Sequence, residues 1–263
     1  MFFKSSLPAY PLNSAPQRWE VPRERVVMLN SLRPTAKLVL QGARRIRAAI
    51  RPKPPNPDRF LKQCKSIIHV GANEGNERAL YDDYSLSVLW VEALPDVYTR
   101  LVQNLADYPK QRAVSALVTD KEGQSYDFHV SNNSGESSSV FEFAGHKQLW
   151  PDVDFDKTIT LRSTTLEALL CSREAPLNSF DALILDVQGA ELLVIQGSEE
   201  LLRHIRFIKA EAADFESYKG ACTFATLTQG LKERGFVYRQ KERFAGEPGI
   251  GSYYNVLYER VAK

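Results

Sequence analysis

The stretch Ser66–Gly75, with the sequence SIIHVGANEG, constrains the fold of this chain more than any other. Residues 67–70 suit a β-strand and run directly into Gly71, and a second glycine follows at Gly75. This pattern predicts a buried strand, a tight glycine turn and then a helix. Because glycine lacks a Cβ, and because the first NH groups of a helix are unpaired, a ligand is expected to approach the backbone here.

A carboxylate ends the next predicted strand. The run Leu86–Glu92 finishes in Glu92, 21 residues after Gly71. In a strand–helix–strand unit, an acid at this place accepts hydrogen bonds from the two hydroxyls of a ribose. The glycine turn and the acid together predict a site for a cofactor that contains a nucleoside.

Strands alternate with helices along most of the chain, which predicts a doubly wound, mostly parallel sheet. We expect an α/β, Rossmann-like fold with seven strands and an antiparallel C-terminal strand. The other five strands are expected at residues 111–118, 179–186, 205–211, 236–240 and 253–259. The helices are expected at residues 76–84, 95–108, about 191–203 and 224–234.

A polar segment interrupts this alternation after the third strand. Ser125–Val130 and Lys157–Arg162 alternate like half-exposed strands, and Ser131–Ser139 is a long polar loop. The loop either closes over the cofactor or is a solvated hairpin tip, and both readings are open. After it, we expect Thr164 to cap a helix and Glu167 to reach back to the same cap.

Residues 1–60 differ from the rest of the chain. They carry twelve Lys and Arg against three Asp and Glu, a net charge of +9; because the whole chain has +2, residues 61–263 carry −7. Prolines are frequent in residues 1–34, and residues 35–51 have the spacing of an amphipathic basic helix. We therefore expect a basic, proline-rich N-terminal arm over 1–60 and one folded domain over 61–263.

The arm's helix has two readings. Its apolar stripe packs on the folded domain, or its arginines contact anionic lipid headgroups or another acidic surface. The negative charge of residues 61–263 disfavours nucleic acid as a partner. No apolar run is long enough to span a membrane, and Pro8 and Pro11 interrupt the start before a signal peptide forms. We expect a cytoplasmic protein, with the membrane surface as the alternative through residues 35–51.

The glycine turn also limits the cofactor. Its spacing is GxxxG, which lacks the GxGxxG of nicotinamide and flavin sites and the GK[ST] of a phosphate-binding loop. A cofactor with a ribose but no pyrophosphate fits better, and S-adenosylmethionine meets that description. Three predicted strands end at or near acids, namely Glu92, Asp186 and Glu211, where ligands of open α/β sheets bind. A single such acid would also suit a helix N-terminus.

At this point the chain resembles the FkbM family of methyltransferases, over residues 64 to about 260. The blocks that carry the resemblance are IHVGANEG (68–75), VEALP (91–95), NL (104–105), DVQGAE (186–191) with IQG (195–197), Glu211 with YKG (218–220), and GF (235–236). The resemblance implies a class I, S-adenosylmethionine-dependent methyltransferase domain over residues 61–263. It implies that Val70, Gly71, Asn73 and Gly75 line the methionine part and that Glu92 holds the ribose. Asp120 is a candidate for the adenine edge, or else simply a turn acid.

Methyl transfer requires alignment of the acceptor oxygen and removal of its proton. Asp186 is the first candidate for this work, with Gln188 and Glu211 assisting and Glu191 beside them. Asp186 and Glu211 could instead hold a divalent cation, but two carboxylates leave most ligands unaccounted for, so no metal is expected. Many family members have a lysine where this chain has Ile184, which leaves the handling of the substrate open.

The expected function is O-methylation of a hydroxyl on a sugar, glycolipid or natural-product acceptor. N- or carboxyl-methylation of a small molecule is one alternative. A non-catalytic binding module that docks through its basic arm is another. Among the histidines, His69 is expected to be a core residue, and His146 is the one plausible catalytic histidine. The sequence gives no indication of the oligomeric state.

Overall fold

The computed structural model describes residues 57–261. The predicted arm helix near 35–51 lies outside these residues, so its existence, its membrane contact and the domain boundary stay predictions. The described chain opens with the 3-10 helix η1 (Arg59–Gln63), in which Phe60 and Leu61 are buried. Lys209 also pairs with Asp58 at 2.7 Å. The residues just before position 61 are therefore already packed on the domain.

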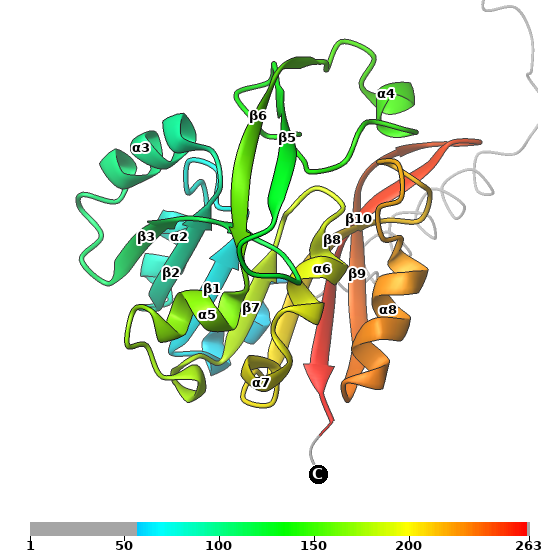
Figure 1. Cartoon of the computed structure of the whole chain (residues 1–263). Helices are drawn as coiled ribbons and strands as arrows, with labels where there is room; N and C mark the ends of the chain where they lie inside the picture. Colours follow the sequence, from blue (N-terminus) through cyan, green and yellow to red (C-terminus); the bar gives the residue numbers. More distant parts are fainter. Residues whose placement is uncertain (1–56, 262–263) are drawn as a thin grey trace, which may run out of the picture. The chain divides into compact units, whose positions relative to one another are not determined.

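Seven strands form the central sheet, in the order β3-β2-β1-β7-β8-β10-β9 (Figure 1). Strand β1 pairs in parallel with β2 on one side and β7 on the other, whereas β10 runs antiparallel to both β8 and β9. This order confirms the predicted fold, a mostly parallel seven-stranded sheet with an antiparallel C-terminal strand. The strands are β1 (Ser66–Val70), β2 (Ser87–Glu92), β3 (Gln111–Ser115), β7 (Ala182–Leu185), β8 (Phe207–Ala213), β9 (Phe236–Glu247) and β10 (Gly251–Arg260).

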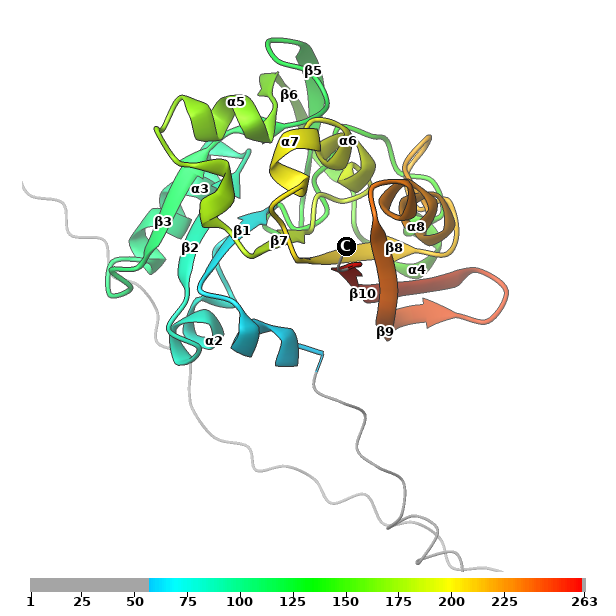
Figure 2. The same ribbon diagram turned by 90° about the horizontal axis from the view of Figure 1, so that it is seen from below.

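Helices cover both faces of the sheet (Figure 2). One face packs on α5 (Leu166–Cys171), α6 (Glu191–Gln196), α7 (Glu199–Leu202) and α8 (Phe224–Glu233), and the other on η1, α2 (Arg78–Asp83) and α3 (Pro95–Asn104). In β1, Ile68 and Val70 join the first core, whereas Ile67 joins the second. Burial on both faces explains why the central strands are continuously apolar. A short 3-10 helix, η2 (Leu177–Ser179), precedes β7.

The polar segment forms a second, three-stranded sheet in the order β4-β6-β5, which stands at the end of the main sheet where the parallel strands finish (Figure 1). Its strands are β4 (Leu117–Val118), β5 (Ser125–Ser131) and β6 (Phe155–Thr164), and the short helix α4 (His146–Leu149) lies between β5 and β6. The strand predicted at 111–118 is therefore divided. Its last two residues leave the main sheet because they pair with Ser163 and Thr164 of β6.

Three local predictions are wrong. The helix predicted at about 191–203 is broken into α6 and α7 at Gly197, where an added Cβ would lie 2.3 Å from the carbonyl oxygen of Thr119. Thr165, and not Thr164, caps α5, because its Oγ1 accepts from the backbone NH of residue 168 at 3.1 Å. Glu167 reaches forward and accepts from the NH groups of residues 200 and 201 at the start of α7.

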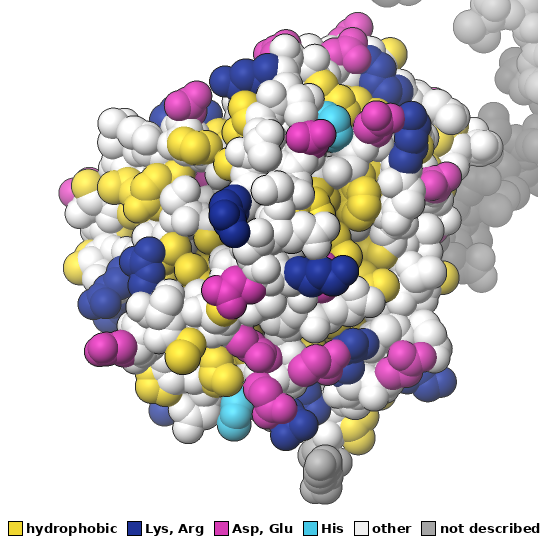
Figure 3. Space-filling model, viewed as in Figure 1, with side chains coloured by type: hydrophobic (Ala, Val, Ile, Leu, Met, Phe, Trp, Pro, Cys, Tyr) yellow, Lys and Arg dark blue, Asp and Glu magenta, His cyan; other side chains and the backbone are white. Residues whose placement is uncertain are grey.

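The surface over the helices α5 to α8 mixes charges of both signs. Figure 3 shows Lys and Arg interspersed with Asp and Glu on this face, and hydrophobic side chains between the β5–β6 and β9–β10 hairpins. Within residues 57–261, no helix has both the length and the apolar character needed to cross a bilayer.

Candidate active site

A cavity of about 340 Å3 lies where the parallel strands of the main sheet finish. The turn after β1, the end of β2, the second sheet with its serine-rich loop, and the turn after β7 all contribute to its wall. Because these segments come from distant parts of the chain, the fold itself assembles the site. The cavity brings together seven of the predicted residues, namely Val70, Gly71, Asn73, Glu92, Asp186, Gln188 and Glu211.

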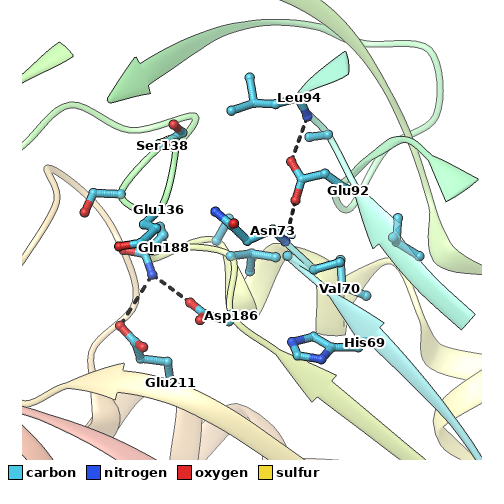
Figure 4. Close-up of a pocket in the computed structure, with 18 of the residues that line it drawn as sticks. His69, Val70, Asn73, Glu92, Leu94, Glu136, Ser138, Asp186, Gln188 and Glu211 are labelled. Atoms are coloured by element: carbon cyan, nitrogen blue, oxygen red, sulfur yellow. Dashed lines mark hydrogen bonds between the residues drawn. The ribbon is translucent and has the colours of Figure 1, made fainter. Parts of the chain in front are cut away.

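Glu92 is held by the backbone on both of its oxygens. Oε2 accepts from the NH of Asn73 at 2.9 Å and Oε1 accepts from the NH of Leu94 at 2.8 Å (Figure 4). Burial raises the pKa of Glu92 to about 7, although these two hydrogen bonds lower it. A carboxylate oxygen accepts more than one hydrogen bond, so both oxygens can also bind hydroxyl groups in the cavity.

The glycine turn works differently from the prediction. Gly71 has φ +82°, and an added Cβ would lie 1.7 Å from the carbonyl oxygen of Asp186. The backbone NH groups of residues 71–73 already donate to the carbonyl oxygen of Val91 and to Glu92, and α2 begins only at Arg78. The expected free NH groups are therefore absent from this described turn. Glycine is required because the turns after β1 and β7 pack tightly together.

Replacing Gly71 by Ala should therefore lower the free energy of unfolding by about 3–5 kcal/mol, from the strained φ and the clash together. Gly249 is a matched control, with φ +87° and no atom within 4 Å of an added Cβ. The change Gly249→Ala should cost about 1 kcal/mol, because only the backbone conformation is penalised. Urea denaturation of both variants measures the difference. Equal losses would show that the contact between the two turns contributes little.

Two predicted cofactor residues do not line the cavity. Gly75 packs on α3, where an added Cβ would lie 2.7 Å from Cδ1 of Leu101. Asp120 accepts from the hydroxyl of Tyr126 at 3.4 Å and is 3.9 Å from the ammonium of Lys121. The cavity lining gives these two assignments no support, and the cofactor roles of Gly75 and Asp120 stay predictions. Apolar residues line this part of the cavity instead, among them Leu94, Ala116, Leu117, Val118 and Phe128.

Gln188 joins the two acids at the other side of the cavity. Its Nε2 donates to Oδ1 of Asp186 at 2.6 Å and approaches Oε1 of Glu211 at 3.4 Å (Figure 4). Its Oε1 accepts from the hydroxyl of Tyr218 at 2.6 Å. Because a hydroxyl donates to one end of the amide and carboxylates accept from the other, the orientation of the amide is fixed. The sequence predicted no role for Tyr218, which was noted only as part of the YKG block shared with the FkbM family.

The surroundings of the two acids at this side raise the pKa of both carboxyl groups. Burial raises the pKa of Asp186 and that of Glu211. The charges of Glu77 and Glu136 raise the pKa of Asp186 further, and the charge of Asp186 raises that of Glu211. Burial raises the pKa of Glu191 to about 7 as well, but its Oε1 accepts from the NH groups of Val187 and Gly189, each at 3.2 Å. It shapes the turn after β7 and does not line the cavity.

The serine-rich loop covers the cavity. Ser137, Ser138 and Ser139 are buried, and Asn133 and residues 135–138 line the wall. The hydroxyl of Ser139 donates to the carbonyl oxygen of Gln188 at 2.8 Å, which ties the loop to the turn after β7. The reading as a solvated hairpin tip is therefore wrong, and the loop closes over the site.

Both histidines under consideration border the cavity. Nδ1 of His69 lies 3.2 Å from the hydroxyl of Tyr81, and its ring stacks on Trp90 at 4.8 Å, so His69 is the core residue that was predicted. His146 is also buried, and its Nδ1 lies 2.8 Å from the hydroxyl of Tyr253. Ile184, at the position of the lysine found in many relatives, is buried in the core and gives the cavity no polar group.

The charge of the cavity is one-sided. Among its described lining residues there is no Lys or Arg, and five are acids: Glu77, Glu92, Glu136, Asp186 and Glu211. Within residues 57–261, no group of three or more His, Cys, Asp and Glu side chains is arranged to hold a metal ion. Such a lining favours cationic and neutral ligands and repels anions.

The profile of the methyltransferase FkbM domain matches residues 69–238, more than half of the chain. The chain belongs to the FkbM methyltransferase family. The resemblance stated from the sequence is thus confirmed. The chain is similar to the 2-O-methyltransferase NoeI of Sinorhizobium fredii (strain NBRC 101917 / NGR234), with 33% identity over 162 residues. The match covers 59% of this chain and 65% of NoeI, less than two thirds of that protein.

Solved structures of other methyltransferases are more distant from this FkbM-family chain. Magnesium protoporphyrin IX methyltransferase of Synechocystis PCC 6803 with bound SAH has a TM-score of 0.45 at 9% identity, over 89% of this chain and 90% of that one. The 1,6-didemethyltoxoflavin-N1-methyltransferase of Burkholderia thailandensis, with its substrate and S-adenosylhomocysteine, has a TM-score of 0.41 at 10% identity, over 90% and 94%. At these scores the likeness is general, and the strand order given above defines the fold.

Proposed function

We propose that this protein transfers a methyl group from S-adenosylmethionine to a hydroxyl of an uncharged, sugar-like acceptor. The observation that carries the proposal is the cavity at the ends of the parallel strands. It has a backbone-held carboxylate, Glu92, on one side and the linked acids Asp186 and Glu211 on the other. Membership of the FkbM methyltransferase family and the name of the 2-O-methyltransferase relative support it.

The residues present suit this cofactor. Glu92 offers a carboxylate to the two ribose hydroxyls, and the apolar residues beside it, among them Leu117 and Phe128, offer a wall for the flat adenine ring. S-adenosylmethionine supplies, when bound, a methyl group on a positively charged sulfur. The acidic lining suits that charge, and about 340 Å3 lies within the range of roughly 300–1,000 Å3 typical of small-molecule sites.

Asp186 is proposed to orient the acceptor hydroxyl and to take its proton. As the new O–C bond forms and the C–S bond breaks, the hydroxyl proton passes to the carboxylate of Asp186. Because Gln188 occupies Oδ1, the other oxygen, Oδ2, is the one proposed to face the hydroxyl. Glu211, whose pKa is raised by burial and by Asp186, holds a proton, so that Asp186 carries the negative charge. Placing a base in this way contributes roughly 10²–10⁴-fold to the rate.

The alternatives are weighed by charge. Methylation of a carboxylate would bring another anion close to Glu136 and Asp186, with no cation among the described lining residues to offset it. Methylation of an amine suits the charge of the cavity but requires the amine to be neutral. A non-catalytic module has no use for the linked acids. The hydroxyl is therefore the acceptor group that we propose.

Neutral acceptors should be methylated faster than matched acidic ones. We expect kcat/KM for p-nitrophenyl glycosides of neutral hexoses to exceed that for the matched hexuronides at least about tenfold. Two like charges 4 Å apart near a protein surface repel by about 4 kcal/mol, and tenfold requires about 1.4 kcal/mol. Transfer of labelled methyl from S-adenosylmethionine measures this, with matched amino sugars as a third set. Equal or better turnover of the hexuronides, or transfer to amines alone, would contradict the proposal.

A further inference from the structure

His146 carries a polar atom for which the protein provides no partner. The residue is 4% exposed, and its Nδ1 lies 2.8 Å from the hydroxyl of Tyr253. Its other ring nitrogen, Nε2, is buried and has no hydrogen-bond partner among the residues that the structure describes. Such groups are rare in folded proteins, because each one loses its bond to water without a replacement. His146 also borders the cavity, which is where a partner could enter.

The imidazole is fixed in place by its surroundings. Its centroid lies 4.8 Å from the ring of Phe143, 4.6 Å from that of Trp150 and 5.2 Å from that of Tyr218. The backbone NH of His146 donates to the carbonyl oxygen of Ser217 at 3.0 Å, which anchors α4 to the segment after β8. Burial lowers the pKa of His146 to about 4, so the ring stays neutral. A rigid, neutral imidazole is suited to orient a neutral ligand.

The position of His146 relates it to the acids that handle the acceptor. The ring of Tyr218 packs on His146, while the Tyr218 hydroxyl donates to Gln188, which in turn holds Asp186. Figure 4 shows Asp186, Gln188 and Glu211 on the opposite side of the cavity from Glu92. His146 is therefore linked to the two acids through Tyr218 and Gln188.

The residues beside His146 suit a ring with one apolar face. Trp150, Val153 and Phe244 also line the cavity, and the ring of Trp150 packs on that of His146. Phe244 is 48% exposed, which places it where the cavity meets solvent. Aromatic side chains pack well on apolar surfaces, and a hydroxyl both donates and accepts. A sugar hydroxyl can therefore pair with Nε2 in either tautomer of the neutral ring.

We infer that the His146 end of the cavity is the acceptor subsite, in which Nε2 of His146 hydrogen-bonds a hydroxyl of a neutral sugar ring packed against Trp150 and Phe244. This inference rests on the proposed function. His146 binds and positions the acceptor, whereas the proton of the methylated hydroxyl passes to Asp186.

A pair of substitutions separates the two nitrogens of the ring. In His146→Asn the amide lies near the place of Nδ1 and can still bond Tyr253, but nothing replaces Nε2. In His146→Gln the amide reaches the place of Nε2. We expect His146→Asn to raise the KM of the best neutral glycoside by about 10- to 100-fold, because one buried hydrogen bond is lost. His146→Gln should raise this KM less. The affinity of both variants for S-adenosylhomocysteine, measured by calorimetry, should stay within about twofold of that of the unchanged protein.

An unchanged KM in His146→Asn would overturn the inference. So would an equal loss of affinity for the glycoside and for S-adenosylhomocysteine, because that result would show a merely structural role. A second measurement uses the unchanged protein and so does not depend on the folding of a variant. The chain has four histidines, and the 15N signal of His146 Nε2 should shift when the glycoside is added to the S-adenosylhomocysteine complex. A signal that moves only with S-adenosylhomocysteine would contradict the subsite.

Failure of the proposed function gives a different result. If the unchanged protein neither binds S-adenosylhomocysteine nor methylates any glycoside, the methyl-transfer proposal falls, and the subsite falls with it. If it binds and methylates while the Nε2 signal and the KM of His146→Asn stay unaffected, only the subsite is wrong.

Discussion

Replacing Glu92 by Ala is expected to weaken the binding of S-adenosylmethionine and S-adenosylhomocysteine by about 100-fold or more. The proposed site loses two hydrogen bonds between ribose hydroxyls and a charged carboxylate, each worth roughly 1.5–3 kcal/mol. The backbone NH groups of Asn73 and Leu94 also lose their acceptor, which loosens the wall of the cavity. Calorimetric titration with S-adenosylhomocysteine measures the effect directly.

Asp120 provides the control for this change. It was also predicted to bind the cofactor, but it lies outside the cavity and accepts a bond from Tyr126. The change Asp120→Ala should leave the affinity for S-adenosylhomocysteine within about twofold. Urea denaturation of both variants shows whether a loss of binding reflects a loss of folding. Full affinity in Glu92→Ala, or its loss in Asp120→Ala, would place the ribose elsewhere.

The pH dependence of the same binding follows from the pKa of Glu92, which burial raises to about 7. Hydroxyl donors favour the charged carboxylate, so affinity should fall as the pH decreases below 7, by at most tenfold per pH unit. In the absence of ligand, a rising pH has the opposite effect, because it lowers the stability of the folded protein. Because the folded protein keeps this proton to a higher pH than the unfolded chain, Glu92 lowers the free energy of unfolding as the pH rises from about 4.5 to 7. The loss is limited to about 3 kcal/mol.

The sheet was predictable from the sequence because its strands are apolar on both faces and end in turns and acids. Glu92 and Asp186 were found by the same signal, since a residue that follows a buried strand has a defined place in the sheet. Gly71 was found from its place after the first strand, but its close neighbour, the carbonyl oxygen of Asp186, is 115 residues away in the chain. Local spacing cannot show a contact of that kind.

The same limit explains the other errors. Gly197 packs closely on the carbonyl oxygen of Thr119, and a hydrogen bond from Ser139 to Gln188 ties the serine-rich loop to the turn after β7. His146 also contacts Tyr253, which is distant from it in the sequence. Patterns of three to seven residues identify elements, whereas the contacts that decide which side chains line a cavity join residues that are distant in sequence.

The largest effect on the reaction itself is expected from Asp186→Asn. The amide has nearly the same shape, and its Oδ1 can still accept from Gln188, but it cannot take the proton of the acceptor hydroxyl. We expect kcat to fall by about 10²–10⁴-fold while the affinity for S-adenosylhomocysteine changes little. Single-turnover transfer of labelled methyl to the best neutral glycoside measures the rate.

Asp181 offers the same chemical change at the opposite end of β7. Its Oδ2 accepts from the NH groups of Lys65 and Ser66, at 2.6 and 3.1 Å, so Asp181→Asn should affect folding more than the rate. If Asp186→Asn keeps its rate, Asp186 is not the base. If it loses S-adenosylhomocysteine as well, Asp186 serves the cofactor. Proton removal is assigned to Asp186 if Asp186→Asn loses rate, keeps its affinity for S-adenosylhomocysteine, and Asp181→Asn keeps its rate. That result shows a loss of chemistry in a site that is still correctly folded.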